Sequence, residues 1–185
     1  MQFLDKKQIT DIMRVAYKRS TRDHLILLLS YHHGLRVSEV TRLTLVDVAD
    51  GKIQVERLKG SLATEHPLKT SDDVLFNERL ALQGWLQERP NDGVALFPGR
   101  WGGFMQPDSV SQMTVRYMEL ARIPTALAHH HSLKHACCSI LSRKGVDIAT
   151  IATLVGHKEI KNTRIYLNIS DSEAAETAFA AFEEN

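Results

Sequence analysis

The chain has 185 residues, of which 43% are hydrophobic and 24% are charged, so it can bury one substantial core and is not a disordered chain. No apolar run approaches the roughly 20 residues that span a bilayer, and residues 1–7 lack the apolar stretch of a secretory signal. The net charge of +1 is unevenly distributed: residues 171–185 hold five of the 22 acidic residues and no Lys or Arg, which leaves 17 acidic against 23 basic residues elsewhere. A mildly basic body with an acidic tail is compatible with nucleic acid, and equally with an ordinary solvated surface.

The two cysteines, Cys137 and Cys138, are adjacent, and this arrangement does not suit a disulfide framework. We expect them to be small buried residues without a catalytic role. Together with the missing signal and membrane segments, they indicate a protein of the reducing cytoplasm.

Helical periodicity dominates the chain and is interrupted by one short β segment. Asp5 and Gln8 form a capping box before the first helix, and Gly145 and Gly156 stand where later helices should end. In chain order, the predicted elements are helices over 5–17, 21–34 and 37–43, strands over 52–58 and 64–68, helices over 73–86, 108–120, 131–144, 147–155 and 160–168, and an Ala-rich acidic tail. The predicted fold class is mainly α with a small antiparallel β-sheet. Residues expected in the core include Leu25, Leu28, Leu29, Trp85 and Leu86.

Four segments contain residue types that suit phosphate chemistry. They are Gly34–Glu39 with the sequence GLRVSE, the turn around Lys59, His131–His135 with the sequence HSLKH, and Gly156-His157 followed by Tyr166 nine residues after the histidine. Taken singly, each has an ordinary structural interpretation. Arg36 suits a surface charge near a helix start, Lys59 a hairpin tip, and Tyr166 a core aromatic residue. Their joint occurrence in this order favours a functional site.

In order and spacing, these segments resemble the catalytic domain of the tyrosine recombinases, which include phage integrases, Xer-type recombinases and fimbrial-switch invertases. The resemblance runs from about Leu4 to Asn168. The hairpin, with RLKG at residues 57–60 and TEHPL at 64–68, is most similar to the fimbrial-switch type. Those proteins lack a separate N-terminal DNA-clamping domain. We therefore expect one tyrosine recombinase catalytic domain over residues 1–185 and no N-terminal core-binding domain, either as a natural minimal enzyme or as an excised domain.

The resemblance implies that Tyr166 attacks a backbone phosphate of duplex DNA, which gives a 3′-phosphotyrosyl link and a free 5′-hydroxyl. The ester retains the bond energy, so rejoining needs neither ATP nor metal, and no cofactor is implied. A phenol with a pKa of about 10 is a poor nucleophile at neutral pH and needs help from its surroundings. The family assigns part of this help to His131, which assists proton transfer at Tyr166.

The resemblance also assigns the other groups. Arg36 holds the non-bridging phosphate oxygens, whose charge grows in the transition state. Lys59 protonates the leaving 5′-oxygen as a general acid, and His157 forms a hydrogen bond with the phosphate. Glu39 and His135 support the site.

Lys134 departs from the family pattern, which is His-x-x-Arg where this chain has His131-x-x-Lys134. Lysine keeps the positive charge but lacks the planar fork that grips two phosphate oxygens at once. We expect a working site in which Lys134 contacts one oxygen. The alternative is a catalytically weakened recombinase-like protein that acts as a DNA-bound accessory or regulatory factor.

Three further alternatives come from single features. Two helices around Gly145 could form a helix-turn-helix regulator, but this would leave the Lys59 hairpin and the Gly-His…Tyr segment unexplained. A type IB topoisomerase would use similar chemistry on one strand without pairing two sites. His131 and His135 have metal-ligand spacing, but no Glu follows His131 as a zincin motif requires, so we expect no metal site.

Recombinases of this family act as tetramers on two DNA sites, so a homo-tetramer on double-stranded DNA is the expected assembly. Residues 171–185 form the acidic C-terminal tail, and its apolar stretch 174–182 is a candidate for docking in cis or in trans. Neither the target DNA sequence nor the direction of exchange follows from the sequence.

Overall fold

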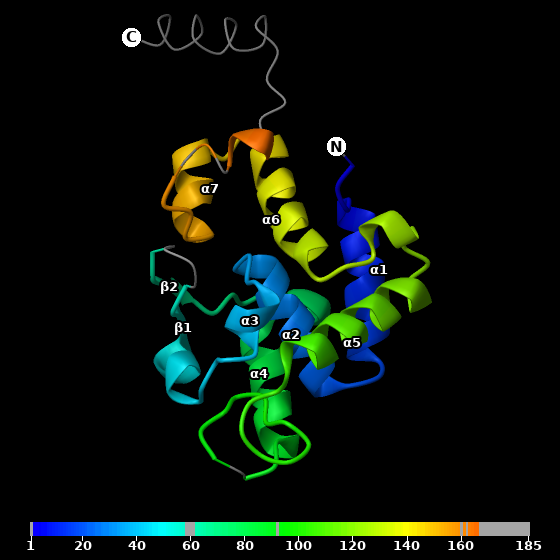
Figure 1. Cartoon of the computed structure of the whole chain (residues 1–185), viewed down its shortest axis with the longest axis vertical. Coiled ribbons are helices and arrows are strands. Elements are labelled where there is room, and N and C mark those ends of the chain that lie inside the picture. Colours follow the sequence, from blue (N-terminus) through cyan, green and yellow to red (C-terminus); the bar gives the residue numbers. More distant parts are fainter. Residues whose placement is uncertain (1, 58–61, 92, 160, 162, 167–185) are drawn as a thin grey trace, which may run out of the picture.

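The computed structural model describes residues 2–57, 62–91, 93–159, 161 and 163–166 (Figure 1). Within them the chain is mainly helical with one two-stranded antiparallel sheet, as predicted. The main elements are α1 (Lys6–Tyr17), α2 (Thr21–His32), α3 (Val37–Val40), β1 (Lys52–Val55), β2 (Thr64–Pro67), α4 (Glu78–Glu88), α5 (Pro107–Leu120), α6 (His131–Arg143) and α7 (Ile148–Leu154). No helix in these ranges is long and apolar enough to cross a membrane.

Helix α2 is the central element, with α1, α4 and α6 packed against it (Figure 1). Its leucines face two sides: Leu25 and Leu29 pack in one buried cluster, and Leu27 and Leu28 pack in another. A helix that is apolar all round has to be covered on every side, and this explains its place in the middle of the fold.

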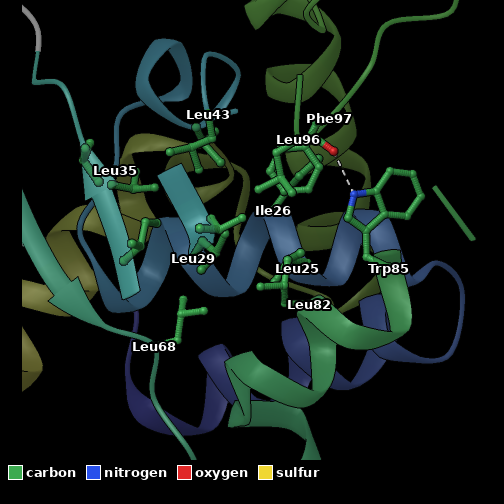
Figure 2. Close-up of a cluster of buried hydrophobic side chains, with 14 of the residues drawn as sticks. Leu25, Ile26, Leu29, Leu35, Leu43, Leu68, Leu82, Trp85, Leu96 and Phe97 are labelled. Carbon is green, nitrogen blue, oxygen red and sulfur yellow. Dashed lines mark hydrogen bonds between the residues drawn. The ribbon is translucent and has the colours of Figure 1, made fainter. Parts of the chain in front are cut away.

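The first cluster fills the space between α2, α4 and the sheet (Figure 2). Trp85 of α4 is buried in it, and its indole Nε1 donates to the carbonyl oxygen of Leu96 at 2.9 Å, as the dashed line shows. The second cluster joins α2 to α1 and α5. Both cysteines are buried and unpaired, as expected.

Two predictions about α4 are wrong. The predicted helix over 73–86 is divided, because Asp73 caps a short 3₁₀ helix at Val74–Phe76 and Asn77 caps α4 through the backbone N–H of Leu80. Two capping side chains four residues apart start two elements. Leu86 is 44% exposed rather than in the core, because it lies about 100° around the helix from Trp85.

The remaining differences lie at element ends. The strands are shorter than predicted and pair from Lys52 with Pro67 to Val55 with Thr64. Within the predicted helix over 160–168, the structure describes a 3₁₀ helix at Arg164–Tyr166 and leaves the last residues outside the described ranges. The capping box of Asp5 and Gln8 is confirmed.

A buried polar network holds strand β2 against the helices. Glu78, the first residue of α4, is fully buried and accepts hydrogen bonds from the backbone N–H of Lys69 at 2.7 Å and from His32 Nδ1 at 2.9 Å. His33 Nε2 also lies 2.9 Å from this carboxylate, and His33 Nδ1 lies 2.9 Å from Nδ1 of His66 on β2. The hairpin is thereby tied to the end of α2.

Candidate active site

Arg36 lies at the N-cap of α3, just after the turn that ends α2. Its side chain is 28% exposed, and Nη1 donates to Glu39 Oε1 at 2.7 Å, while its backbone N–H donates to Glu39 Oε2 at 2.8 Å. The turn requires glycine at Gly34, where φ is +57° and a Cβ atom would lie 2.6 Å from Cγ1 of Val155. Glu39 and Gly34 therefore fix the guanidinium of Arg36 at the surface.

The guanidinium of Arg57 lies buried behind Glu39 and was not assigned a role from the sequence. A guanidinium has five N–H groups, and all five are used here. They donate to Thr64 Oγ1 at 3.1 Å, Glu39 Oε2 at 3.1 Å, and the carbonyl oxygens of Gly34 at 3.3 Å, His33 at 2.9 Å and Leu154 at 3.0 Å. Arg57 thus joins the hairpin, the α2–α3 turn and the end of α7.

The charge of Glu39 is preserved by these partners. Burial alone would raise the pKa of Glu39, but the hydrogen bond from the Arg36 backbone and the charge of Arg57 outweigh it, so the pKa is lowered. The carboxylate is therefore ionised at neutral pH and orients both arginines.

Lys134 comes from the first turns of α6 and is 1% exposed. Its Nζ donates to the carbonyl oxygen of Val155 at 3.1 Å. Burial, followed by the charges of Arg36 and Arg57, lowers the pKa of Lys134 to about 8. We call the group of Arg36, Glu39, Arg57 and Lys134 the cation cluster.

Two imidazoles lie beside the cation cluster. Desolvation, and then the charges of Lys134 and Arg36, lower the pKa of His157 to about 4. Desolvation and then His135, Lys134 and Arg36 do the same for His131, which is the first residue of α6 and is exposed. Both rings are therefore neutral at pH 7, and each has one nitrogen that donates and one that accepts.

His157 is positioned by a hydrogen bond to its ring and by close packing of the glycine that precedes it. Its Nδ1 lies 2.9 Å from Thr163 Oγ1. The preceding Gly156 has φ of +67°, and a Cβ atom there would lie 2.8 Å from the carbonyl oxygen of Leu62 and 2.9 Å from Cγ of Arg57. Glycine therefore allows the root of the hairpin to lie directly on the turn that carries His157.

Tyr166 is only 6% exposed and lies in a small hydrophobic cluster. Its hydroxyl is 2.7 Å from His135 Nδ1, and its ring is 5.5 Å from that of Phe3. Burial, and then the neighbouring Cys138, raise the pKa of the phenol well above its ordinary value. We call Phe3, His135 and Cys138 the tyrosine pocket.

The site is therefore only partly assembled around one centre. The structure brings together the expected Arg36, Glu39, Lys134, His131 and His157. The phenol of Tyr166 contacts His135 instead of His131, although the two rings of α6 touch, with centroids 4.4 Å apart. The prediction for Lys59 and the prediction for the C-terminal tail lie outside the described residues.

Arg57 is a residue of the candidate site that sequence reasoning missed, and a signal for it was present. Burial alternates along β1, with Ile53 and Val55 inward, and the same period of two continues to Arg57. An arginine at an inward position of a strand needs buried acceptors, and this marks it as a structural centre.

Solved structures that share this fold include recombinases and integrases. The XerH site-specific recombinase bound to its difH substrate superposes with a TM-score of 0.81 at 21% identity, covering 96% of this chain and 54% of that chain. The XerA recombinase gives a TM-score of 0.76 at 22% identity, covering 98% and 65%. At these identities the likeness establishes the fold, which is that of a tyrosine recombinase catalytic domain.

A model of the Phage integrase family matches residues 2–173. The type 1 fimbriae regulatory protein FimE of Escherichia coli K12 is 32% identical over 174 residues, covering 89% of this chain and 84% of that protein. Tyrosine recombinase XerC of Azotobacter vinelandii is 36% identical over 154 residues, covering 80% of this chain and 48% of that protein. The chain belongs to the phage integrase family, and it spans about half the length of the XerC relative.

Proposed function

We propose that this chain is a site-specific DNA recombinase in which Tyr166 carries the covalent intermediate. The phenolic oxygen attacks the scissile phosphorus, the bond from phosphorus to the 5′-oxygen breaks, and a 3′-phosphotyrosyl diester forms. The phenolic proton leaves to a base and the 5′-oxygen takes up a proton. A 5′-hydroxyl from the partner strand then attacks the same phosphorus and releases the phenol, so no external energy source enters the balance.

The observation that supports this best is the convergence of cations and neutral imidazoles at the start of α6, one helical turn before His135, which contacts the Tyr166 hydroxyl. Arg36 and Lys134 supply positive charge for the non-bridging oxygens, where charge grows in the transition state. His157 donates a hydrogen bond to the phosphate. His131 is neutral at pH 7 and accepts the phenolic proton. Lys59 serves as the proton donor to the 5′-oxygen.

The phenol has to leave His135 before it can attack. Its hydroxyl is hydrogen-bonded to His135 Nδ1, and its raised pKa makes it a weak nucleophile in that position. Binding of the scissile phosphate beside His131 provides a competing partner for the hydroxyl, and we expect this exchange to precede cleavage.

A second candidate function, a DNA-bound accessory factor with weak cleavage, is favoured by Lys134. Its ammonium group is almost fully buried and is bound to the Val155 carbonyl, where an arginine would present a second nitrogen. In this function the chain binds the same DNA as a recombinase but supports strand exchange by other subunits.

A nicked duplex that releases a short strand after cleavage separates the two functions. Wild-type protein should form a covalent protein–DNA adduct that survives denaturation on DNA flanking its gene, and Tyr166→Phe should form none. An adduct in Tyr166→Phe would overturn the assignment of the nucleophile. An adduct in Lys134→Arg but not in the wild type would support the accessory function, and none in either would overturn the proposed chemistry.

The proposed assembly is a homo-tetramer on two duplex sites in the cytoplasm, with the tail from one subunit docking in cis or in trans. Removal of residues 172–185 should weaken assembly on DNA more than it lowers the melting temperature of the monomer. Gel-shift titration and thermal unfolding measure the two effects. Normal pairing of two sites by the shortened protein would contradict the docking.

A further inference from the structure

A basic groove lies between the start of α2 and the exposed face of α5, and none of the proposed catalytic residues lines it. Its volume is about 660 Å³. Arg19 borders it from the turn before α2, Arg22 from the first turn of α2 and Arg116 from α5, with Ser109 and Gln112 beside it. Guanidinium groups from two elements therefore face the same space.

The floor of the groove is a fixed polar contact between the two helices. The hydroxyl of Tyr117 on α5 donates a hydrogen bond to Asp23 Oδ2 at 3.0 Å, and Arg22 Nη2 lies 2.8 Å from Asp23 Oδ1. Burial and then Asp23 raise the pKa of Tyr117 to about 12, while the charges of Arg116 and Arg19 act in the opposite direction. Both of these guanidinium groups are thus close enough to act on the Tyr117 hydroxyl.

The charge of the groove is positive. Asp23 is 8% exposed and is already engaged by Arg22 and Tyr117. Arg19 and Arg116 are exposed, and neither forms an ion pair with a carboxylate in the described part of the chain. Three guanidiniums against one carboxylate attract an anion.

We propose that this groove binds backbone phosphates of duplex DNA that flank the cleaved bond. The inference rests on the proposed function. Exposed arginines, with a hydroxyl and an amide at Ser109 and Gln112, are the groups that contact phosphate oxygens without reading sequence. An open groove also suits a polymer chain better than a small enclosed anion.

The dimensions allow one duplex to reach both sites. The 12 residues of α2, which separate the groove from Arg36, span about 18 Å. One helical turn of DNA is about 34 Å long. A duplex whose scissile phosphate lies at Arg36 is therefore long enough to place flanking phosphates at Arg19 and Arg116.

The test removes the two unpaired arginines and leaves the Arg22–Asp23 pair intact. Arg19→Gln/Arg116→Gln is compared with Arg14→Gln/Arg143→Gln, which loses the same formal charge elsewhere. Binding of a site-containing duplex and an unrelated duplex is measured by fluorescence anisotropy at several salt concentrations. We expect the groove variant to lose about two from the slope of log affinity against log salt, and about tenfold or more in affinity at 0.1 M salt, for both duplexes. Adduct formation at saturating DNA should be unchanged.

Each outcome decides a claim. A groove variant that binds like the control variant would overturn the phosphate site. A changed salt slope without any Tyr166-dependent adduct would keep the groove and overturn the recombinase chemistry. If the wild-type protein binds no duplex, both claims are wrong.

Discussion

The cation cluster and the tyrosine pocket meet at α6, which contributes Lys134 to the first and His135 and Cys138 to the second, but different forces build them. In the cation cluster, every N–H of Arg57 and both oxygens of Glu39 are committed to directional hydrogen bonds. In the tyrosine pocket, ring packing and contacts of the hydroxyl with His135 and Cys138 hold the phenol. Ser142 Oγ also donates to the carbonyl oxygen of Tyr166 at 2.9 Å. A buried charge network loses its balance when one member is removed, whereas aromatic packing contributes about 0.5–1.5 kcal/mol per contact. The comparison indicates a rigid arrangement at the proposed phosphate site and weaker packing around the proposed nucleophile, which we expect to leave its resting place at small cost.

The largest effect is expected from Arg57→Met. It leaves Glu39 buried with one cation fewer, which should cost about 3–5 kcal/mol of unfolding free energy. It should also slow adduct formation on the nicked duplex about 100-fold or more, because Arg36 would then be neutralised by Glu39. Urea unfolding and single-turnover cleavage measure the two losses.

The double variant Glu39→Gln/Arg57→Met is the control for this mechanism. It removes the uncompensated charge, so it should regain part of the lost stability. If the double variant is less stable than Arg57→Met alone, the network does not act through charge balance.

The next effect concerns pH and the protonation of Lys134. The ammonium is charged below its pKa of about 8 and neutral above it, so wild-type cleavage should fall as pH rises through 8. In Lys134→Arg the side chain at this position stays positively charged over the whole pH range, because a guanidinium is not deprotonated there. The ratio of wild-type to variant rate cancels the titration of shared groups, and it should fall about 30-fold between pH 7 and pH 9.5. A ratio that stays constant over this range would show that Lys134 supplies no charge to the reaction.

The smallest effect is expected from Phe3→Ala in the tyrosine pocket. The half-buried ring of Phe3 packs on both Tyr166 and His135, so its removal should loosen the resting phenol. Single-turnover adduct formation should rise about 2–10-fold, which corresponds to one aromatic contact. Slower cleavage in a folded Phe3→Ala variant would mean that the pocket positions the phenol for attack.

The sequence predicted most of the fold because its signals are local. Capping residues, helical periodicity and glycines after helices marked most of the elements to within a few residues. The divided helix before α4 was missed because both halves have apolar residues at helical spacing and only the paired caps at Asp73 and Asn77 separate them. The exposure of Leu86 was missed because the spacing of apolar residues does not state which of two adjacent residues faces the core.

The candidate site was predicted less completely, because it depends on contacts between distant segments. Motif spacing identified Arg36, Lys134, His131 and His157, which the fold brings together. It could not indicate that Tyr166 contacts His135, since that choice depends on how the 3₁₀ helix at Arg164–Tyr166 packs on α6. Burial of Lys134 likewise depends on α7 and on the turn at Gly34, both remote in sequence.

Gly34 and Gly156, the two glycines beside the site, have a consequence for chimaeric proteins that combine segments of this chain with segments of its relatives. The absence of a side chain at Gly34 leaves room for Val155, which lies in the turn after α7, and its absence at Gly156 leaves room for Arg57. Arg57 also donates a hydrogen bond to the carbonyl oxygen of Gly34. The turn at Gly34 and the turn at Gly156 are therefore complementary in shape. A chimaera that takes only one of them from another recombinase would meet a misfitting surface, whereas transfer of both turns together with the hairpin root would move a complete unit.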